Sequence, residues 1–290
     1  MKPAEVLSSG VSLRPAVRSD GEEFTDILAV EEPLEIRLGF ADGTHRAISI
    51  TMRTPGEDGE LAAGFLFTEG ILKSRDQFRQ IRHCGLKIGS GSGVVDRTSA
   101  INSNTIRVDL AADVDVDLGR LERHFYTSSS CGVCGKASID TLRTEIKPIE
   151  NDRLAVSRDV IHALPTRLRE TQSIFDQTGG LHASALFSSD GKLDLVREDV
   201  GRHNALDKVI GHKFLNDKLP LSDRVLLVSG RASFELVQKA LMAGIPVLAA
   251  VGAPSSLAVE LAAEYGMTLI GFVRDSRFNI YTGHERVIGN

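Results

Sequence analysis

Residues 224–273 read RVLLVSGRASFELVQKALMAGIPVLAAVGAPSSLAVELAAEYGMTLIGFV. This stretch predicts three short apolar strands that alternate with two helices. The strands are Arg224 to Val228, Pro246 to Val251 and Thr268 to Val273, and the helices are Ser233 to Met242 and Ser255 to Tyr265. Continuously apolar strands separated by helices are typical of a parallel sheet that is covered on both faces.

The preceding residues extend this α/β pattern towards the N-terminus. We expect a helix from about Arg158 to Asp176 that is interrupted near Pro165, two hairpin-linked strands at 181–187 and 193–197, and a helix at about 204–215. This order, a helix followed by a hairpin and then by alternating helices and strands, resembles that of the cytidine-deaminase-like fold. The sequence therefore predicts a three-layer α/β domain of this kind, with a mostly parallel sheet, over residues 151–290.

Deaminase chemistry is not supported by the residues themselves. Deaminases bind zinc with a His-x-Glu motif and a Pro-Cys-x-x-Cys motif. Here His182-Ala183-Ser184 lacks the glutamate, and no cysteine follows Cys134.

The N-terminal part of the chain has a different pattern. Two alternating runs, 34–38 and 47–52, flank Asp42-Gly43, which is a strong hairpin signal. A helix up to about Gly70 and a strand at 101–110 follow. We predict a small α+β domain over residues 25–120, a connector over 121–150 that carries two close cysteines, and a loose polar arm over residues 1–24.

Composition excludes several classes of protein. The 34 basic and 39 acidic side chains give a net charge of −5, which argues against a nucleic-acid binder that relies on overall charge. No apolar run approaches the roughly 20 residues that a membrane helix needs. Three cysteines are too few for a secreted disulfide framework, and the N-terminus resembles no signal peptide. We therefore expect a cytoplasmic protein without a membrane or nucleic-acid partner.

The two close cysteines, Cys131 and Cys134, lie among glycine and serine residues, which favours an accessible loop. A helix is expected just beyond Cys134, and both its N-terminus and Lys136 would favour the reactive thiolate. Two other interpretations remain open. The pair could be half of a zinc site completed by Cys84, His83 and His124, or the motif of a thioredoxin-like oxidoreductase.

A second cluster of charged and amide residues spans 196–208, at a strand-to-helix junction. Asn204 and Asp207 fit a capping arrangement at the start of the helix. Arg202 and His203 are left for a pocket or a subunit contact, with His203 a candidate proton donor.

A third set of residues follows the last three strands, in the loops 229–233, 252–256 and 274–277. In open parallel sheets, ligands bind beyond the carboxyl ends of the strands. Arg231, Arg274 and Arg277 would add positive charge suited to phosphate groups. Neither a Gly-x-Gly-x-x-Gly motif nor a Walker motif occurs, so an ordinary dinucleotide or nucleoside triphosphate site is not indicated.

Several segments together resemble the formate dehydrogenase accessory sulfurtransferase family, FdhD, from about residue 25 to the C-terminus. They are Ser130–Gly135, Thr178–His182, Glu198–Asn204, Ser229–Arg231 and Gly271–Arg274. The resemblance implies a dimeric sulfur carrier. Such a carrier accepts sulfur from a cysteine desulfurase and delivers it to the molybdenum or tungsten bis-guanine-dinucleotide cofactor of formate dehydrogenase.

The resemblance also implies roles for individual residues. Cys131 matches the persulfide-carrying cysteine and Cys134 its partner. The cofactor is implied as cargo with no permanently bound metal, and its binding stretch matches Phe272, Val273, Arg274, Asp275, Ser276 and Arg277. The competing hypothesis is a non-catalytic pterin- or nucleotide-binding chaperone whose two cysteines hold zinc.

Overall fold

The computed structural model describes residues 6–8, 10–84, 104–112, 114, 116, 146–149, 154–274 and 276–289. Cys131, Cys134 and Asp275 therefore lie outside the described residues, as does most of the predicted connector. No helix within the described ranges is both long and apolar enough to cross a bilayer.

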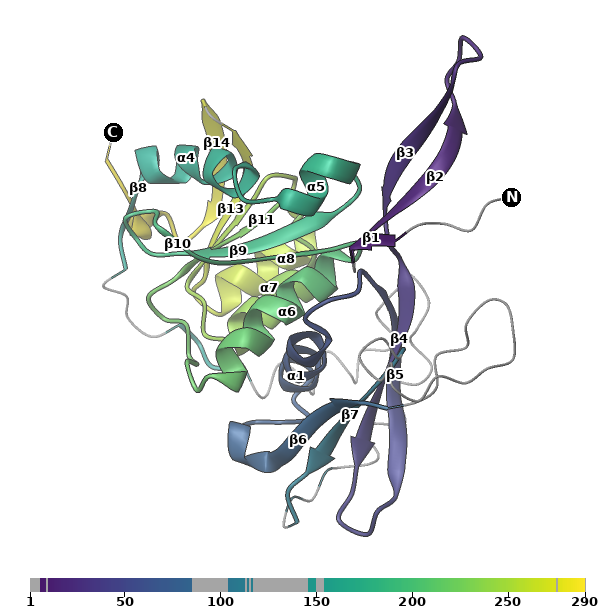
Figure 1. Ribbon diagram of the computed structural model, residues 1–290. Coiled ribbons are helices and arrows are strands. Elements are labelled where there is room, and N and C mark those ends of the chain that lie inside the picture. Colours follow the sequence, from purple (N-terminus) through teal and green to yellow (C-terminus); the bar gives the residue numbers. More distant parts are fainter. Residues whose placement is uncertain are drawn as a thin grey trace.

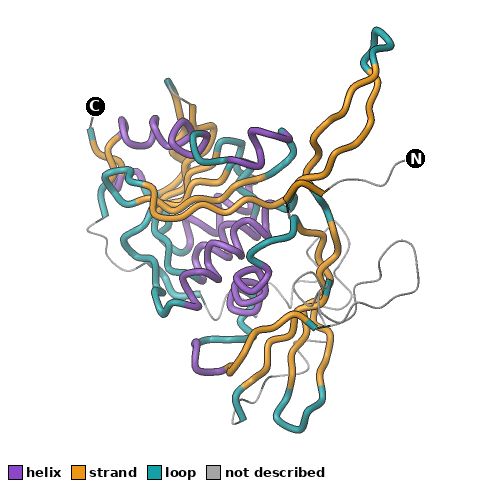
Figure 2. The backbone as a smooth tube through the Cα atoms, in the orientation of Figure 1, coloured by secondary structure: helices purple, strands orange, loops and turns teal. Residues whose placement is uncertain are grey.

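The C-terminal part of the chain forms three layers around a six-stranded sheet (Figure 1, Figure 2). Helices α4 and α5 cover one face of the sheet, and α6, α7 and α8 cover the other. In sheet order the strands are β10 (Leu193–Asp199), β9 (His182–Phe187), β11 (Val225–Val228), β12 (Val247–Ala250), β13 (Thr268–Arg274) and β14 (Arg277–Thr282). The helices are α4 (Arg158–Arg169), α5 (Ser173–Thr178), α6 (Arg202–Leu215), α7 (Phe234–Met242) and α8 (Ser256–Glu264).

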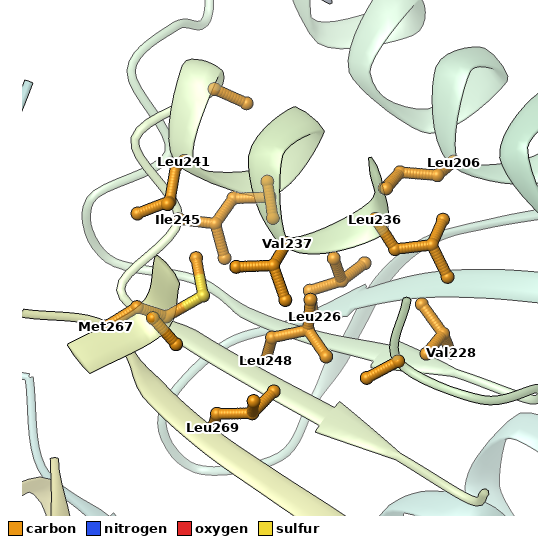
Figure 3. Close-up of a cluster of buried hydrophobic side chains, with 14 of the residues drawn as sticks. Leu206, Leu226, Val228, Leu236, Val237, Leu241, Ile245, Leu248, Met267 and Leu269 are labelled. Carbon is orange, nitrogen blue, oxygen red and sulfur yellow. The ribbon is translucent and has the colours of Figure 1, made fainter. Parts of the chain in front are cut away.

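A hydrophobic core lies between the sheet and helices α6 to α8. Figure 3 shows Leu226, Leu248 and Leu269 from three adjacent strands beneath the apolar side chains of α7. A second core on the opposite face joins α4 to the same strands through Ile161, Leu164 and their neighbours. The two cores explain why β11 and β12 are buried at every position and read as continuous apolar runs.

Two predictions for this region need correction. The sheet is mixed rather than mostly parallel, because only β11–β12 and β12–β13 are parallel among its described pairs. The edge strand β14 was not expected from the sequence, since half of its residues are polar. The helix break near Pro165 is also wrong, because Pro165 lies inside α4 and the chain leaves the helix only after Arg169.

The predicted N-terminal hairpin is confirmed as part of a four-stranded sheet. Its order is β5 (His45–Arg53), β4 (Glu32–Gly39), β7 (Thr105–Leu110) and β6 (Phe78–His83), with β4 and β7 parallel. Helix α1 (Asp58–Thr68) packs over this sheet and closes a third core, which includes Leu34, Ile36 and Leu61.

The prediction of a loose arm over residues 1–24 is wrong for the described part. β1 (Val6–Ser8), β2 (Val11–Val17) and β3 (Glu23–Ala29) form a small antiparallel sheet that projects from the body (Figure 1). Val11, Leu13 and Val17 alternate along β2, and Leu13 pairs with Ile27 across the ribbon. This period of two was obscured in the sequence because Pro15 occupies one of the alternating positions.

The two parts of the molecule meet where α1 crosses α6. The crossing is close because a glycine of each helix faces the other. A β-carbon on Gly211 would lie 1.8 Å from the Glu60 carbonyl oxygen, and one on Gly64 would lie 1.9 Å from the Asp207 carbonyl oxygen.

We expect Gly211→Ala to destabilise the protein by about 1–3 kcal/mol, because the helices must separate to admit the methyl group. Urea denaturation would measure the loss. Gly59→Ala is the matched control, since the nearest atom to its β-carbon is 3.8 Å away. An unchanged or higher stability for Gly211→Ala, as expected of alanine in an open helix, would contradict the close crossing.

Candidate functional site

A hollow of about 830 Å³ lies beneath α4 and α5, where β11 and β12 end. Its floor includes Ser229 and Val251, which directly follow these strands. The walls come from the second half of α4, the α4–α5 link, α5 and the Gly179-Gly180 turn. The lining residues are Pro165, Thr166, Leu168, Arg169, Glu170, Gln172, Phe175, Asp176, Gly179, Gly180, Leu181, His182, Ser229 and Val251. The prediction that ligands bind at this edge of the sheet therefore finds a cavity of ligand size.

Arg274 borders this hollow. Its Nη1 donates to the carbonyl oxygen of Val251 at 2.8 Å, and its own carbonyl oxygen lies 3.0 Å from Nδ1 of His162 on α4. Arg231, Arg274 and Arg277 are all exposed. Of the three predicted arginines, the structure thus ties Arg274 to the wall of the hollow.

The three strand ends are held together by backbone hydrogen bonds beyond the strands themselves. The amide of Gly252 donates to the Gly230 carbonyl, and the amide of Phe272 donates to the Gly252 carbonyl. A β-carbon on Gly252 would lie 2.9 Å from the Gly230 oxygen and 3.0 Å from the Cα of Arg231. Glycine at position 252 therefore allows the loop that follows β12 to approach the loop that carries Arg231.

The predicted cofactor-binding stretch is a strand hairpin and not a loop that follows the last strand. Phe272 to Arg274 belong to β13, Arg277 begins β14, and the register shifts between Gly271 and Arg274. Phe272 has a φ of 55°, and 38% of its surface is exposed. A bulky residue in the left-handed region is unusual, and such strain gathers at functional sites. Val273 points instead into the core beneath α4.

Glu198, in the charged junction, supports the wall of the hollow. Its carboxylate accepts hydrogen bonds from the backbone amides of Ile174 and Phe175, at 3.2 and 2.9 Å, in the first turn of α5. Burial raises the pKa of Glu198 although these amides oppose the shift. The residue therefore fixes α5, and with it Phe175, from the neighbouring strand β10.

The capping interpretation of Asn204 and Asp207 is wrong. Helix α6 begins earlier, with Gly201 as its N-cap, so Asn204 is inside the helix. The Asn204 side-chain nitrogen donates to the Met52 carbonyl at 2.7 Å and to the Asp199 carboxylate at 3.0 Å. Asp207 forms a buried ion pair with Lys239 of α7 at 3.0 Å. Both side chains hold neighbouring elements together rather than capping the helix.

His203 is poorly suited to donate a proton to a ligand. Burial, together with the positive charges of Lys239 and Arg202, lowers its pKa to about 4. Its Nε2 lies 3.4 Å from the Ser233 hydroxyl at the start of α7. The imidazole is therefore neutral near pH 7 and acts as a hydrogen-bonding partner.

His182, which ends the Thr178–His182 segment of the family resemblance and was assigned no role there, lies in the hollow. A β-carbon on Gly230 would lie 3.4 Å from His182 Nδ1, which places the ring beside the Ser229-Gly230-Arg231 loop. Burial and then the charge of Arg202 lower the pKa of His182. This ring is also neutral near pH 7.

The described residues contain no group of three or more histidine, cysteine, aspartate or glutamate side chains arranged to hold a metal ion. His83 lies 3.6 Å from Asp58, and His124 is outside the described residues.

The sequence of this chain matches a family of known proteins. The family model described as FdhD/NarQ matches residues 29–288. The chain belongs to the FdhD/NarQ family.

Relatives of this FdhD/NarQ member cover almost all of its length. A protein of Streptomyces coelicolor named sulfur carrier protein FdhD is 51% identical over 288 residues, which are 99% of this chain and 94% of that protein. A protein of the same name from Mycolicibacterium paratuberculosis is 53% identical over 268 residues, or 90% and 92% of the two chains. A crystal structure from Desulfotalea psychrophila, named for a formate dehydrogenase accessory protein, matches with a TM-score of 0.68 and 25% identity, covering 96% of this chain and 98% of that one.

The walls of the hollow are the part of the candidate site that sequence reasoning missed. Gln172 comes from the α4–α5 link and Phe175 from α5, and no motif marks them. The available signal was Gly179-Gly180, which follows shortly after and belongs to the Thr178–His182 segment of the family resemblance. Gly179 has a φ of 65°, which turns the chain from α5 into the hollow.

Proposed function

We propose that this FdhD/NarQ family member is a sulfur carrier that moves sulfur as a cysteine persulfide to a molybdenum or tungsten cofactor, for the activation of formate dehydrogenase. The observation that carries the proposal is the near-complete coverage, at about half identity, by relatives named sulfur carrier protein FdhD. The solved structure named for a formate dehydrogenase accessory protein supports the client.

The chemistry is assigned to Cys131, with Cys134 as its partner. In the loading step, the Cys131 thiolate attacks the outer sulfur of a persulfide on a cysteine desulfurase. A new sulfur–sulfur bond forms on Cys131, and the donor cysteine leaves as a thiolate. The step needs an accessible, easily deprotonated thiol, which the glycine- and serine-rich sequence around Cys131 favours.

The cargo is the bis-guanine-dinucleotide cofactor, and the residues at the carboxyl ends of the central strands fit its chemistry. A dinucleotide presents planar rings and phosphates. The hollow supplies apolar walls, and Arg274 at its border supplies a guanidinium group suited to phosphate. We further propose that the carrier acts in the cytoplasm as a homodimer.

The mass of the intact protein after incubation with a cysteine desulfurase and cysteine tests the proposal. We expect an adduct of about 32 Da, one sulfur atom, that is absent from Cys131→Ala. Stoichiometric, tightly held zinc without such an adduct would favour the competing chaperone hypothesis.

Arginine variants test the cargo site separately. Replacing Arg274 or Arg277 with alanine should weaken GDP binding about ten- to a hundredfold, because a charged hydrogen bond contributes about 1.5–3 kcal/mol. Calorimetry with GDP, as a stand-in for one nucleotide arm, measures the change. Sulfur loading at Cys131 should persist in both variants. Unchanged GDP affinity in both would place the phosphates elsewhere, most simply near Arg202.

A further inference from the structure

The antiparallel ribbon of β2 and β3 extends from the body of the molecule and continues directly into the N-terminal sheet. We propose that this ribbon is a dimerisation arm that docks on the outer face of the N-terminal sheet of a second copy of the chain. The inference rests on the homodimer of the proposed function and assigns its contact surface. Two copies related by a twofold axis would exchange arms, so that each contact occurs twice.

Exposed apolar side chains concentrate on the arm and on the sheet that follows it. Among the described residues, seven large hydrophobic side chains are exposed, and four of them lie here. Val17 and Leu28 on the arm are 65% and 43% exposed, and Ile50 and Met52 of β5 are 56% and 46% exposed. Apolar side chains that gather on one part of a surface are typical of a contact with another protein.

The arm carries apolar side chains on both of its faces. In its register Leu13 lies opposite Ile27, whereas Ala16 lies opposite Phe24 on the other face. A two-stranded ribbon is only marginally stable in water unless a further element packs on it. Figure 1 shows that the arm, beyond its root, extends away from the helices and the other sheets. The distal half of the arm therefore presents apolar surface to a partner.

The edges of the arm are unsuited to pairing with a further strand. Pro15 removes one amide donor from β2, because proline has no amide hydrogen. On β3, the amide of Ile27 donates to the Asp26 carboxylate at 2.9 Å and is not available to a neighbouring strand. Natural proteins block strand edges with such residues. The arm is therefore expected to bind a partner through its faces and not by extending its sheet.

An apolar surface that suits the arm is present on the chain itself. Ile50 pairs with Glu35 of β4, whereas Leu34, one position earlier, is buried in the core with α1. Because side chains alternate along a strand, Ile50 lies on the face of the sheet away from α1, as does Met52 two positions later. We call this face the outer face of the N-terminal sheet.

The tip of the arm is acidic. Its one arginine, Arg18, forms an ion pair with Glu22. Two further carboxylates of the tip, Asp20 and Glu23, are exposed. A surface that accepts the tip should therefore carry positive charge.

The outer face of the N-terminal sheet has this charge. Asp109 is shared by two arginines, since its carboxylate lies 3.1 Å from Arg82 Nε and 2.6 Å from Arg107 Nε. Glu35 is paired with Arg37 at 2.7 Å. Three guanidinium groups thus share two carboxylates, and the excess positive charge complements the acidic tip of the arm.

The placement of the arm and the sheet allows two copies to bind each other. Residues 30–31 join the two elements, which extend in opposite directions from this link (Figure 1, Figure 2). The tip of the arm is therefore remote from the sheet of its own chain. When two copies are aligned antiparallel, the arm of each lies along the sheet of the other. Such a self-complementary contact closes in a twofold dimer.

Sedimentation equilibrium of single aspartate variants tests the contact. We expect the wild-type protein to be a dimer. Val17→Asp and Ile50→Asp should each raise its dissociation constant at least tenfold, because each places a charge in an apolar contact. Ile288→Asp is the matched control, since Ile288 is 50% exposed in β15 (Val287–Ile288) and lies on neither surface; it should dimerise like wild type. A monomeric wild type, or arm and sheet variants that both dimerise like wild type, would overturn the inference.

Photo-crosslinking identifies what the arm contacts. Val17 is replaced by the photoreactive p-benzoylphenylalanine, and isotopically labelled chains are mixed with unlabelled ones. Cross-links should join a labelled to an unlabelled copy, at the outer face of the N-terminal sheet. Cross-links only within one chain, or only to another surface of the second copy, would overturn the inference.

Sulfur loading is a separate readout of the proposed function. Incubation of the Val17→Asp variant with a cysteine desulfurase and cysteine should still give an adduct of about 32 Da on Cys131. This adduct in a protein that proves to be monomeric would show that the sulfur-carrier proposal stands although the arm inference has failed. Loss of the adduct from a wild-type dimer would show the reverse.

Discussion

Lys208→Met is expected to lower the free energy of unfolding by about 3–5 kcal/mol, because it leaves a buried carboxylate without its cation. Lys208 Nζ lies 2.8 Å from Asp199 Oδ2, and the two side chains are 1% and 0% exposed. The same nitrogen donates to the carbonyl oxygens of Thr54 and Glu198, at 3.0 and 3.3 Å. One lysine thus joins the N-terminal sheet to the strand that supports α5.

Urea denaturation of wild type and variant would measure the loss. Asp223→Ala is the control, because that carboxylate also pairs with a cation, Arg224, but is 71% exposed. Its removal should change stability by no more than about 1 kcal/mol. A Lys208→Met protein as stable as this control would show that the buried pair does not hold the two parts together.

The elements that could be predicted from the sequence are those whose pattern is local. Strands β11, β12 and β13 are short apolar runs between helices, and the β4–β5 hairpin has Asp42-Gly43 at its turn. Their burial depends on residues a few positions apart, so a short window is sufficient. Strand β14 and the strands β2 and β3 of the projecting arm were not predicted. Their sequences contain many polar side chains, and their structure depends on the strands with which they pair.

The site was predictable where it follows from topology. The rule that ligands bind at strand ends pointed to Arg274, which donates to the carbonyl of Val251 in the lining of a cavity. The capping interpretation of Asn204 failed for the opposite reason. Its side chain is held by Met52, 152 residues earlier in the chain, and no local rule detects a partner at that separation.

The hollow could not be predicted from the sequence because the residues that line it are far apart along the chain. Its wall combines the α4–α5 link with Ser229 and Val251, which follow two later strands. Each piece alone reads as an ordinary turn or helix end. The packing of α4 against β13 and β10 brings them to one cavity.

Cys131→Ala is expected to abolish the activation of formate dehydrogenase in cells that carry only this variant. The persulfide needs the sulfur of Cys131, and no other atom of an alanine side chain can accept it. Removal of one thiol from a glycine- and serine-rich segment should change stability by only about 0.5 kcal/mol. The variant should therefore accumulate like wild type, and formate oxidation in cell extracts would report the loss.

Cys84→Ala is the control that separates a specific thiol from the general loss of a cysteine. Cys84 follows β6 of the N-terminal sheet and is half-buried. Its replacement should leave activation intact. If Cys131→Ala also leaves activation intact while Cys134→Ala removes it, the persulfide belongs on Cys134, and the two cysteines exchange roles. If activation survives both single changes and the double change, sulfur does not pass through this pair. The hollow and Arg274 would then serve a carrier of the intact cofactor, which GDP calorimetry on the double variant would still detect.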